Sequence, residues 1–135
     1  MKTKNPFPPG FDSEINTIAI DFDGVIHDYS KGYHDGTCYG EAIHGAIDSI
    51  KLLAEKYSIV IYTAKARPDR PLVNGKTGTE LVKEWLEAHD ILKYVKEITS
   101  IKPRAFLYVD DNCYRFNNWS ETLHFIKENN ENKSL

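Results

Sequence analysis

Two pairs of aspartates stand at the ends of apolar runs and are well suited to bind a cation. Asp21 and Asp23 end the run IAIDFD, and Asp110 and Asp111 end the run FLYVDD. Unit charges 4 Å apart repel by roughly 4 kcal/mol at an effective dielectric constant of 20, so clustered carboxylates need a cation. Hard oxygen ligands without a His or Cys set favour Mg²⁺. The sequence predicts a magnesium site here; the alternative is that each aspartate only caps the turn after its strand.

Three further residues near these run ends offer groups that hold a phosphoryl group. Gly24 can turn the backbone so that consecutive N–H groups face an anion. Thr63 ends the apolar run SIVIYT with a hydroxyl, and Lys102 offers an ammonium before the last apolar run. A cation, backbone donors, a hydroxyl and an ammonium together stabilise a transferring phosphoryl group. Taken singly, Thr63 is equally well a plain strand end and Lys102 a solvated charge, so the interpretation depends on the set.

Apolar patterning indicates the elements that position these residues. Short runs rich in β-branched residues predict strands. The expected strands are 15–20, 58–62, 95–99 and the run 105–111. Strands that alternate with helices predict an α/β fold with a mainly parallel sheet. Strands buried on both faces should be continuously apolar, as these are, and the polar ends of parallel strands should meet at one edge of the sheet.

Helices are indicated by apolar side chains at three- and four-residue spacing. One helix is expected within about 39–56, and a second after Thr77, which forms a capping-box pattern with Glu80. Ser120 is expected to cap a last helix that runs to about Glu128. The remaining ends, 1–14 and 130–135, are expected to form an extended arm and a frayed tail.

Bulk composition narrows the class of protein. The chain has 135 residues, which suits one domain over 1–135, and its net charge of −3 argues against a protein that coats nucleic acid. The sequence has no apolar stretch of membrane-spanning length and no apolar signal region near residue 1. Cys38 and Cys113, the two cysteines, are therefore expected to be free thiols in a reducing compartment. These observations favour a cytoplasmic protein that does not associate with membranes.

The motifs, in their order and spacing, resemble those of the haloacid-dehalogenase-like (HAD) phosphohydrolases. IAIDFDGV matches the family's first motif, an apolar strand followed by Asp-x-Asp-Gly-Val/Thr, and SIVIYT matches the second. Lys102 before the last strand matches the third, and FLYVDD matches the fourth. The match spans 18–111. The resemblance implies a Rossmann-like three-layer sandwich around the parallel sheet and a phosphomonoesterase activity.

The resemblance also implies roles for individual residues. Asp21 would be the nucleophile that forms an aspartyl-phosphate, and Asp23 the general acid and then the general base. Mg²⁺ would be held by Asp21, the backbone carbonyl of Asp23 and Asp110, with Asp111 binding through water or orienting Lys102. The predicted phosphate-binding residues are Phe22, Gly24, Thr63, Ala64 and Lys102.

The intervals between motifs hold no room for a cap domain, so the chain is similar to small capless bacterial and phage members of the family. Open sites of this kind often act on large phosphorylated substrates, and a polynucleotide end is one candidate. The candidate substrate contacts are His27, Lys31, Arg67 and Arg70. The alternative for each is a solvated loop residue. Other functions left open are a phosphotransferase of the same fold, a non-catalytic phosphate-binding domain and a metal-dependent nuclease. The sequence leaves open whether the protein is a monomer or a small homo-oligomer.

Overall fold

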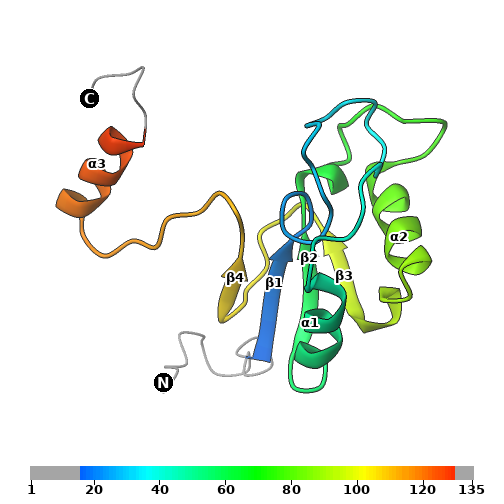
Figure 1. The fold of residues 1–135 in the computed structure, drawn as a ribbon, viewed down its shortest axis with the longest axis horizontal. Helices are drawn as coiled ribbons and strands as arrows, with labels where there is room; N and C mark the ends of the chain where they lie inside the picture. Colours follow the sequence, from blue (N-terminus) through cyan, green and yellow to red (C-terminus); the bar gives the residue numbers. More distant parts are fainter. Residues whose placement is uncertain (1–15, 130–135) are drawn as a thin grey trace.

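Four parallel strands form the centre of the computed structural model, which describes residues 16–129 (Figure 1). The predicted arm at 1–14 and the tail at 130–135 lie outside the described residues. The strands are β1 (Thr17–Asp21), β2 (Ser58–Tyr62), β3 (Val95–Thr99) and β4 (Leu107–Val109). The α-helices are α1 (Ala46–Leu53), α2 (Gly78–Ala88) and α3 (Trp119–Glu128), and the 3-10 helices are η2 (Ala64–Ala66) and η3 (Leu92–Tyr94).

The strand order is β3-β2-β1-β4, with all neighbours parallel, so the predicted α/β class with a parallel sheet is confirmed. β1 is central and pairs with both β2 and β4. Its last residue, Asp21, lies opposite Tyr62 at the end of β2, and Ile20 lies opposite Val109 at the end of β4. The residues that follow these strands therefore emerge at the same edge of the sheet.

One face of the sheet carries the hydrophobic core, and both α1 and α2 pack on it. The register places Ile18 beside Ile59 and Ile20 beside Ile61, so these four side chains share a face. They form one buried cluster with residues of both helices: Ile50, Val82, Trp85 and Leu86. Fully burying an aliphatic side chain contributes about 1.5–3 kcal/mol, so this face supplies much of the fold's stability.

The other face carries no helix in the described part of the chain. The link from β3 to β4 returns across β2 and β1, and a right-handed connection in that direction must run along this face. It does so as an irregular segment, 100–106, and the Tyr108 hydroxyl donates a hydrogen bond to the Pro103 carbonyl at 2.5 Å. α3 lies apart from the sheet (Figure 1). The predicted three-layer arrangement is therefore not seen; the described residues form one helical layer on a sheet.

β4 is more exposed than its sequence predicts. Leu107 is 40% exposed and Val109 37% exposed, whereas Ile18 and Ile59 on the neighbouring strands are almost fully buried. β4 is an edge strand, and neither α1 nor α2 extends over it. The expectation that the apolar runs are buried on both faces is thus correct for β1 and β2 and wrong for both edge strands, β3 and β4.

Helix ends follow local chemistry. Thr77 and Glu80 form the predicted capping box at the start of α2. α1 begins later than predicted because Gly45, just before it, has a left-handed φ of 85°. α3 is capped by Asn118, whose side chain accepts the Glu121 N–H at 2.9 Å, so the prediction that Ser120 is the cap is wrong. Among the described residues, none of the helices has the length and apolar character needed to cross a bilayer.

Candidate active site at the carboxyl edge of the sheet

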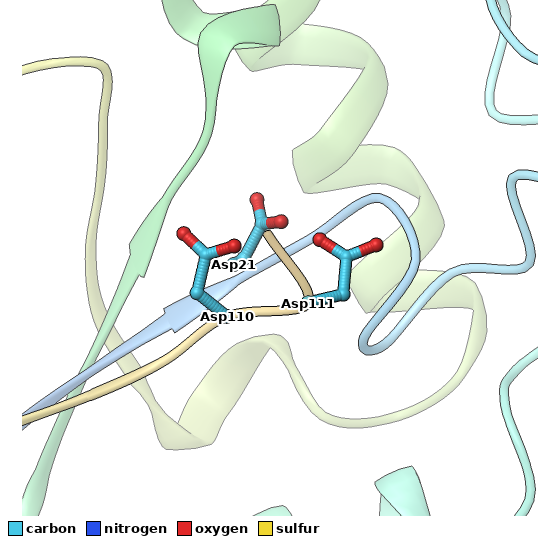
Figure 2. A group of neighbouring side chains, drawn as sticks. All are labelled: Asp21, Asp110 and Asp111. Carbon is cyan, nitrogen blue, oxygen red and sulfur yellow. The ribbon is translucent and has the colours of Figure 1, made fainter. Parts of the chain in front are cut away.

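Three of the four predicted acidic residues meet where β1 and β4 end. Carboxylate oxygens of Asp21, Asp110 and Asp111 all lie within 4.8 Å of one another (Figure 2). Asp21 is the last residue of β1, and the other two follow β4 directly. The pairing of β1 with β4 in parallel brings them together, as the sequence predicts.

The electrostatics of this group are unfavourable without a counter-charge. The pKa of Asp21 is raised to about 7, mainly because the carboxyl is partly buried and next because Asp110 lies beside it. Asp111 and Asp23 add to the rise, while the Phe22 N–H, which donates to Asp21 Oδ1 at 2.9 Å, opposes it. A cation among these carboxylates would favour their ionised forms. The hard oxygen donors fit Mg²⁺ in type.

Gly24 allows Asp111 to approach the group. It has a φ of +86°, and a Cβ placed on it would lie 2.1 Å from Asp111 Oδ2. Its N–H donates to the His27 carbonyl at 2.9 Å, closing the turn after β1. The structure therefore gives Gly24 a steric role, and its amide is satisfied within the turn rather than turned toward an anion as expected.

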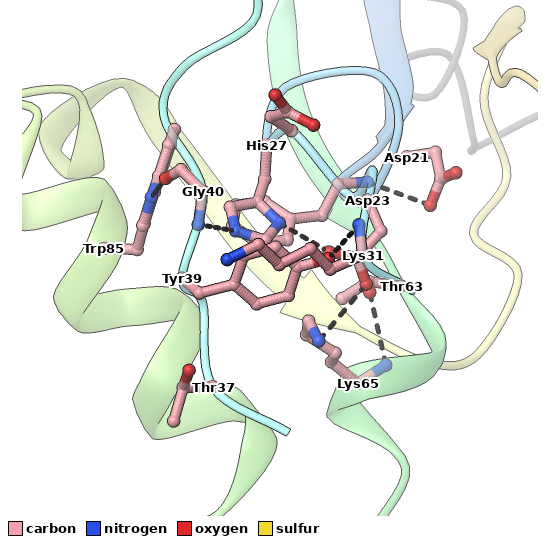
Figure 3. Close-up of polar contacts among 12 residues, drawn as sticks. Asp21, Asp23, His27, Lys31, Thr37, Tyr39, Gly40, Thr63, Lys65 and Trp85 are labelled. Atoms are coloured by element: carbon pink, nitrogen blue, oxygen red, sulfur yellow. Dashed lines mark hydrogen bonds and ion pairs between the residues drawn. The ribbon is translucent and has the colours of Figure 1, made fainter. Parts of the chain in front are cut away.

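Asp23 lies outside the cluster of three carboxylates and is bound by two buried side chains. His27 Nδ1 lies 2.9 Å from Asp23 Oδ1, and Lys65 Nζ lies 3.4 Å from Oδ2 (Figure 3). Lys65 is only 2% exposed and His27 is fully buried. Lys65 was not among the predicted site residues. The one signal in the sequence is its position two residues after Thr63, at the same edge of the sheet.

His27 supports Asp23 and does not face solvent. The Gly40 N–H donates to His27 Nε2 at 2.8 Å, so Nε2 is an acceptor and Nδ1 carries the proton that is donated to Asp23. The ring stacks on Phe22 with centroids 5.0 Å apart. The sequence analysis named His27 as a candidate substrate contact. In the structure the side chain is buried and both ring nitrogens are hydrogen-bonded within the protein, so His27 does not lie where a substrate could contact it.

The two ends of the loop from Asp28 to Tyr39 lie next to each other and are held by hydrogen bonds. The Asp28 N–H donates to the Glu41 carbonyl at 2.9 Å, next to the bond between Gly40 and His27. The Gly40 carbonyl accepts the Trp85 Nε1–H at 2.9 Å, which ties the end of the loop to α2. The two ends of this loop are therefore fixed against the core.

Of the predicted phosphate-binding residues, Ala64 and Lys102 line cavities beside the acidic cluster, whereas Thr63 is buried. Ala64 lines a cavity of about 380 Å³ together with the three clustered carboxylates. Lys102 lines a second cavity, of about 210 Å³, which shares Asp21 and Asp110, and its Nζ lies 4.8 Å from the Tyr108 ring centroid. Thr63 is buried, and its Oγ1 accepts the Lys65 N–H at 3.2 Å as the cap of η2.

Of the remaining candidate substrate contacts, only Arg67 lines the larger cavity. Its guanidinium binds Asp69 through two hydrogen bonds, of 3.0 and 2.7 Å. Lys31 lies over the Tyr39 ring, and Arg70 lies over another tyrosine of the same loop, each 5.8 Å from the ring centroid. Neither lines the cavities beside Asp21.

Fold and site define a parallel α/β protein with an acidic cluster at the carboxyl edge of its sheet. Comparison with known proteins finds no matching family model, no matching curated protein and no matching solved structure.

Proposed function

We propose that the protein is a Mg²⁺-dependent phosphomonoesterase that acts through an aspartyl-phosphate on Asp21. The observation that supports this most is the meeting of Asp21, Asp110 and Asp111 beyond the ends of two adjacent parallel strands, beside a polar cavity. Ligands of parallel α/β sheets bind at this edge. The motif order that resembles the HAD phosphohydrolases supports the same function.

The metal would be held by the residues that the structure brings together. Oxygens of Asp21, Asp110 and Asp111 fit a hard divalent cation, and the backbone carbonyl of Asp23 would complete the set. When bound, Mg²⁺ supplies charge neutralisation for the phosphoryl oxygens. The unfavourable proximity of the three carboxylates, seen in the raised pKa of Asp21, supports a cation there.

The reaction has two steps. In the first, an Asp21 oxygen attacks phosphorus and forms a P–O bond, while the bond to the leaving oxygen breaks and Asp23 gives that oxygen its proton. In the second, water attacks the phosphoryl group, Asp23 accepts the water proton, and inorganic phosphate leaves with the Asp21 carboxylate restored. Asp23 therefore carries a proton at the start and at the end of the cycle and is a carboxylate between the two steps. The His27 N–H and the Lys65 ammonium would stabilise that carboxylate as it forms.

The open, polar cavity suits a substrate that extends beyond its phosphate. Asp21, Ala64 and Arg67 line this cavity, and Arg67 is exposed at 59% of its side chain. A guanidinium at this position would bind a second anionic group, as on a nucleotide or a polynucleotide end. Return of the phosphoryl group to an acceptor alcohol instead of water would make the same site a phosphotransferase.

Hydrolysis of phenyl and 4-nitrophenyl phosphate with Mg²⁺ tests the proposal. Asp21→Asn removes the nucleophile and should reduce turnover to background, while Asp48→Asn on the exposed face of α1 should leave turnover unchanged. Turnover should also stop when Mg²⁺ is chelated. A folded Asp21→Asn variant with normal turnover would refute the aspartyl-phosphate mechanism, and a wild-type protein that binds phosphate without hydrolysing any ester would favour the non-catalytic alternative.

A further inference from the structure

Lys65 is a buried lysine whose ammonium lacks a hydrogen-bond partner among the described residues. Its side chain is 2% exposed, and Nζ makes no hydrogen bond there. The nearest opposite charge is Asp23 Oδ2, at 3.4 Å, and the Tyr29 ring centroid lies 5.1 Å away. Lysines are seldom fully buried, because removing an ammonium from water is costly unless it is paired. The position of this side chain therefore calls for a reason beyond packing.

The backbone around Lys65 is arranged to hold it at this place. Thr63 Oγ1 accepts the Lys65 N–H at 3.2 Å, which fixes the turn after β2. The start of α2 approaches so closely that a Cβ on Gly78 would lie 1.7 Å from the Lys65 carbonyl oxygen. Two separate elements thus determine where the Lys65 side chain begins.

The Asp23 carboxylate is held at both oxygens (Figure 3). His27 Nδ1–H binds Oδ1 at 2.9 Å, and the Lys65 ammonium faces Oδ2 at 3.4 Å. Both partners are buried, and the Gly40 N–H fixes the tautomer of His27. A carboxylate held by two rigid partners keeps one orientation, whereas a free aspartate side chain samples several rotamers.

We infer that Lys65 is a positioning residue that, with His27, orients Asp23 toward the leaving oxygen. This inference rests on the proposed phosphomonoesterase function, in which Asp23 protonates that oxygen. Proton donation matters most for leaving groups that are poor as anions, and a misplaced acid loses most of its effect. Lys65 therefore determines which phosphate esters the site hydrolyses well, favouring those of weakly acidic alcohols, such as sugars and nucleosides.

The test compares two esters that differ in their need for an acid. Phenyl phosphate has a poor leaving group, and 4-nitrophenyl phosphate has a good one. Lys65→Met keeps the length of the side chain and removes its charge. We expect it to reduce kcat for phenyl phosphate by about 100-fold, the lower end of general-acid effects, and kcat for 4-nitrophenyl phosphate by less than about tenfold. KM for both esters should change little, because Lys65 does not line the cavity beside Asp21.

Two further variants complete the design. Lys65→Arg restores a cation and should recover most of the phenyl phosphate turnover. Lys51→Met removes an exposed lysine of α1, away from the site, and should leave the ratio of the two kcat values unchanged. If Lys65→Met does not fold, by circular dichroism, Lys65→Gln offers a neutral polar side chain for the same comparison.

The possible results separate this inference from the proposed function. Equal losses on the two esters in a folded Lys65 variant would show a merely structural role and overturn the inference, while the phosphatase proposal would stand. If the wild-type protein hydrolyses neither ester with Mg²⁺, the proposed function fails and the inference fails with it. A selective loss on phenyl phosphate, restored by Lys65→Arg, supports both.

Discussion

Replacing Asp21 with Asn should have opposite effects on stability without and with a metal ion. The pKa of Asp21 is raised from 3.8 to about 7 by burial and by the neighbouring carboxylates. Between these values the folded protein keeps a proton that the unfolded chain has lost. Stability is therefore highest below about pH 4, falls as the pH rises toward 7, and stays low above that. Asn cannot ionise, so the variant escapes this loss.

The size of the effect follows from the pKa. At about 1.4 kcal/mol for each tenfold change in acidity, a rise from 3.8 to about 7 corresponds to roughly 4 kcal/mol. Asp21 is only partly buried, and solvent screening reduces this to about 1–2 kcal/mol. For a chain of this length, we expect Asp21→Asn to melt roughly 3–8 °C above the wild type at pH 8.

The assay is thermal unfolding followed by circular dichroism, in EDTA and in excess Mg²⁺, at pH 4 and pH 8. In EDTA the advantage of the variant should be present at pH 8 and nearly absent at pH 4. Mg²⁺ at pH 8 should stabilise the wild type, because the ion binds only the folded cluster, and should have much less effect on the variant. Asp48→Asn is the control and should show neither difference. An Asp21→Asn variant with no gain in EDTA at pH 8 would refute the crowding of carboxylates described above.

Two other substitutions test local features of the site and the fold. Gly24→Ala should cost about 1–2 kcal/mol in backbone strain and should also weaken Mg²⁺ binding in isothermal titration, because the new Cβ would displace Asp111. Gly32→Ala is its matched control: φ is also positive, at +63°, but no atom lies within 4 Å of the added Cβ, so a similar loss of metal affinity there would contradict the steric explanation. Thr77→Ala removes the cap of α2 and should lower the free energy of unfolding by about 1 kcal/mol in urea titrations while leaving kcat unchanged. Thr79→Ala, two residues further along and inside α2, removes no cap and should cost less; an equal loss would argue against the capping box.

The elements that depend on local pattern could be predicted from the sequence. β2 occupies the predicted 58–62, and α2 begins where the Thr77 capping box places it. The predictions were wrong where the bounds or the burial of an element depend on a single backbone conformation or on a tertiary contact. The left-handed Gly45 delays α1, and the edge position of β4 exposes an apolar run that reads like a buried strand.

Some features of the candidate site could likewise be predicted from the sequence, and others could not. The meeting of Asp21 with Asp110 and Asp111 follows from parallel strands, whose ends share an edge. The partners of Asp23 do not follow from the sequence, because a lysine reads as a solvated charge until the fold buries it. The close approach of α2 that accompanies the burial of Lys65 is marked in the sequence by nothing more than a glycine at position 78.

The fixed ends of the loop from Asp28 to Tyr39 allow the length of the loop to change without moving the residues that hold Asp23. Gly40 is hydrogen-bonded to both His27 and Trp85. The distance between the two ends of the loop is therefore fixed and does not depend on the length of the loop. Doubling such a loop costs only about 0.6 kcal/mol in closure entropy. Insertions or deletions between Tyr29 and Tyr39 can therefore change the length of this loop while the two residues whose rings lie against Lys65 and His27, and with them the partners of Asp23, stay in place.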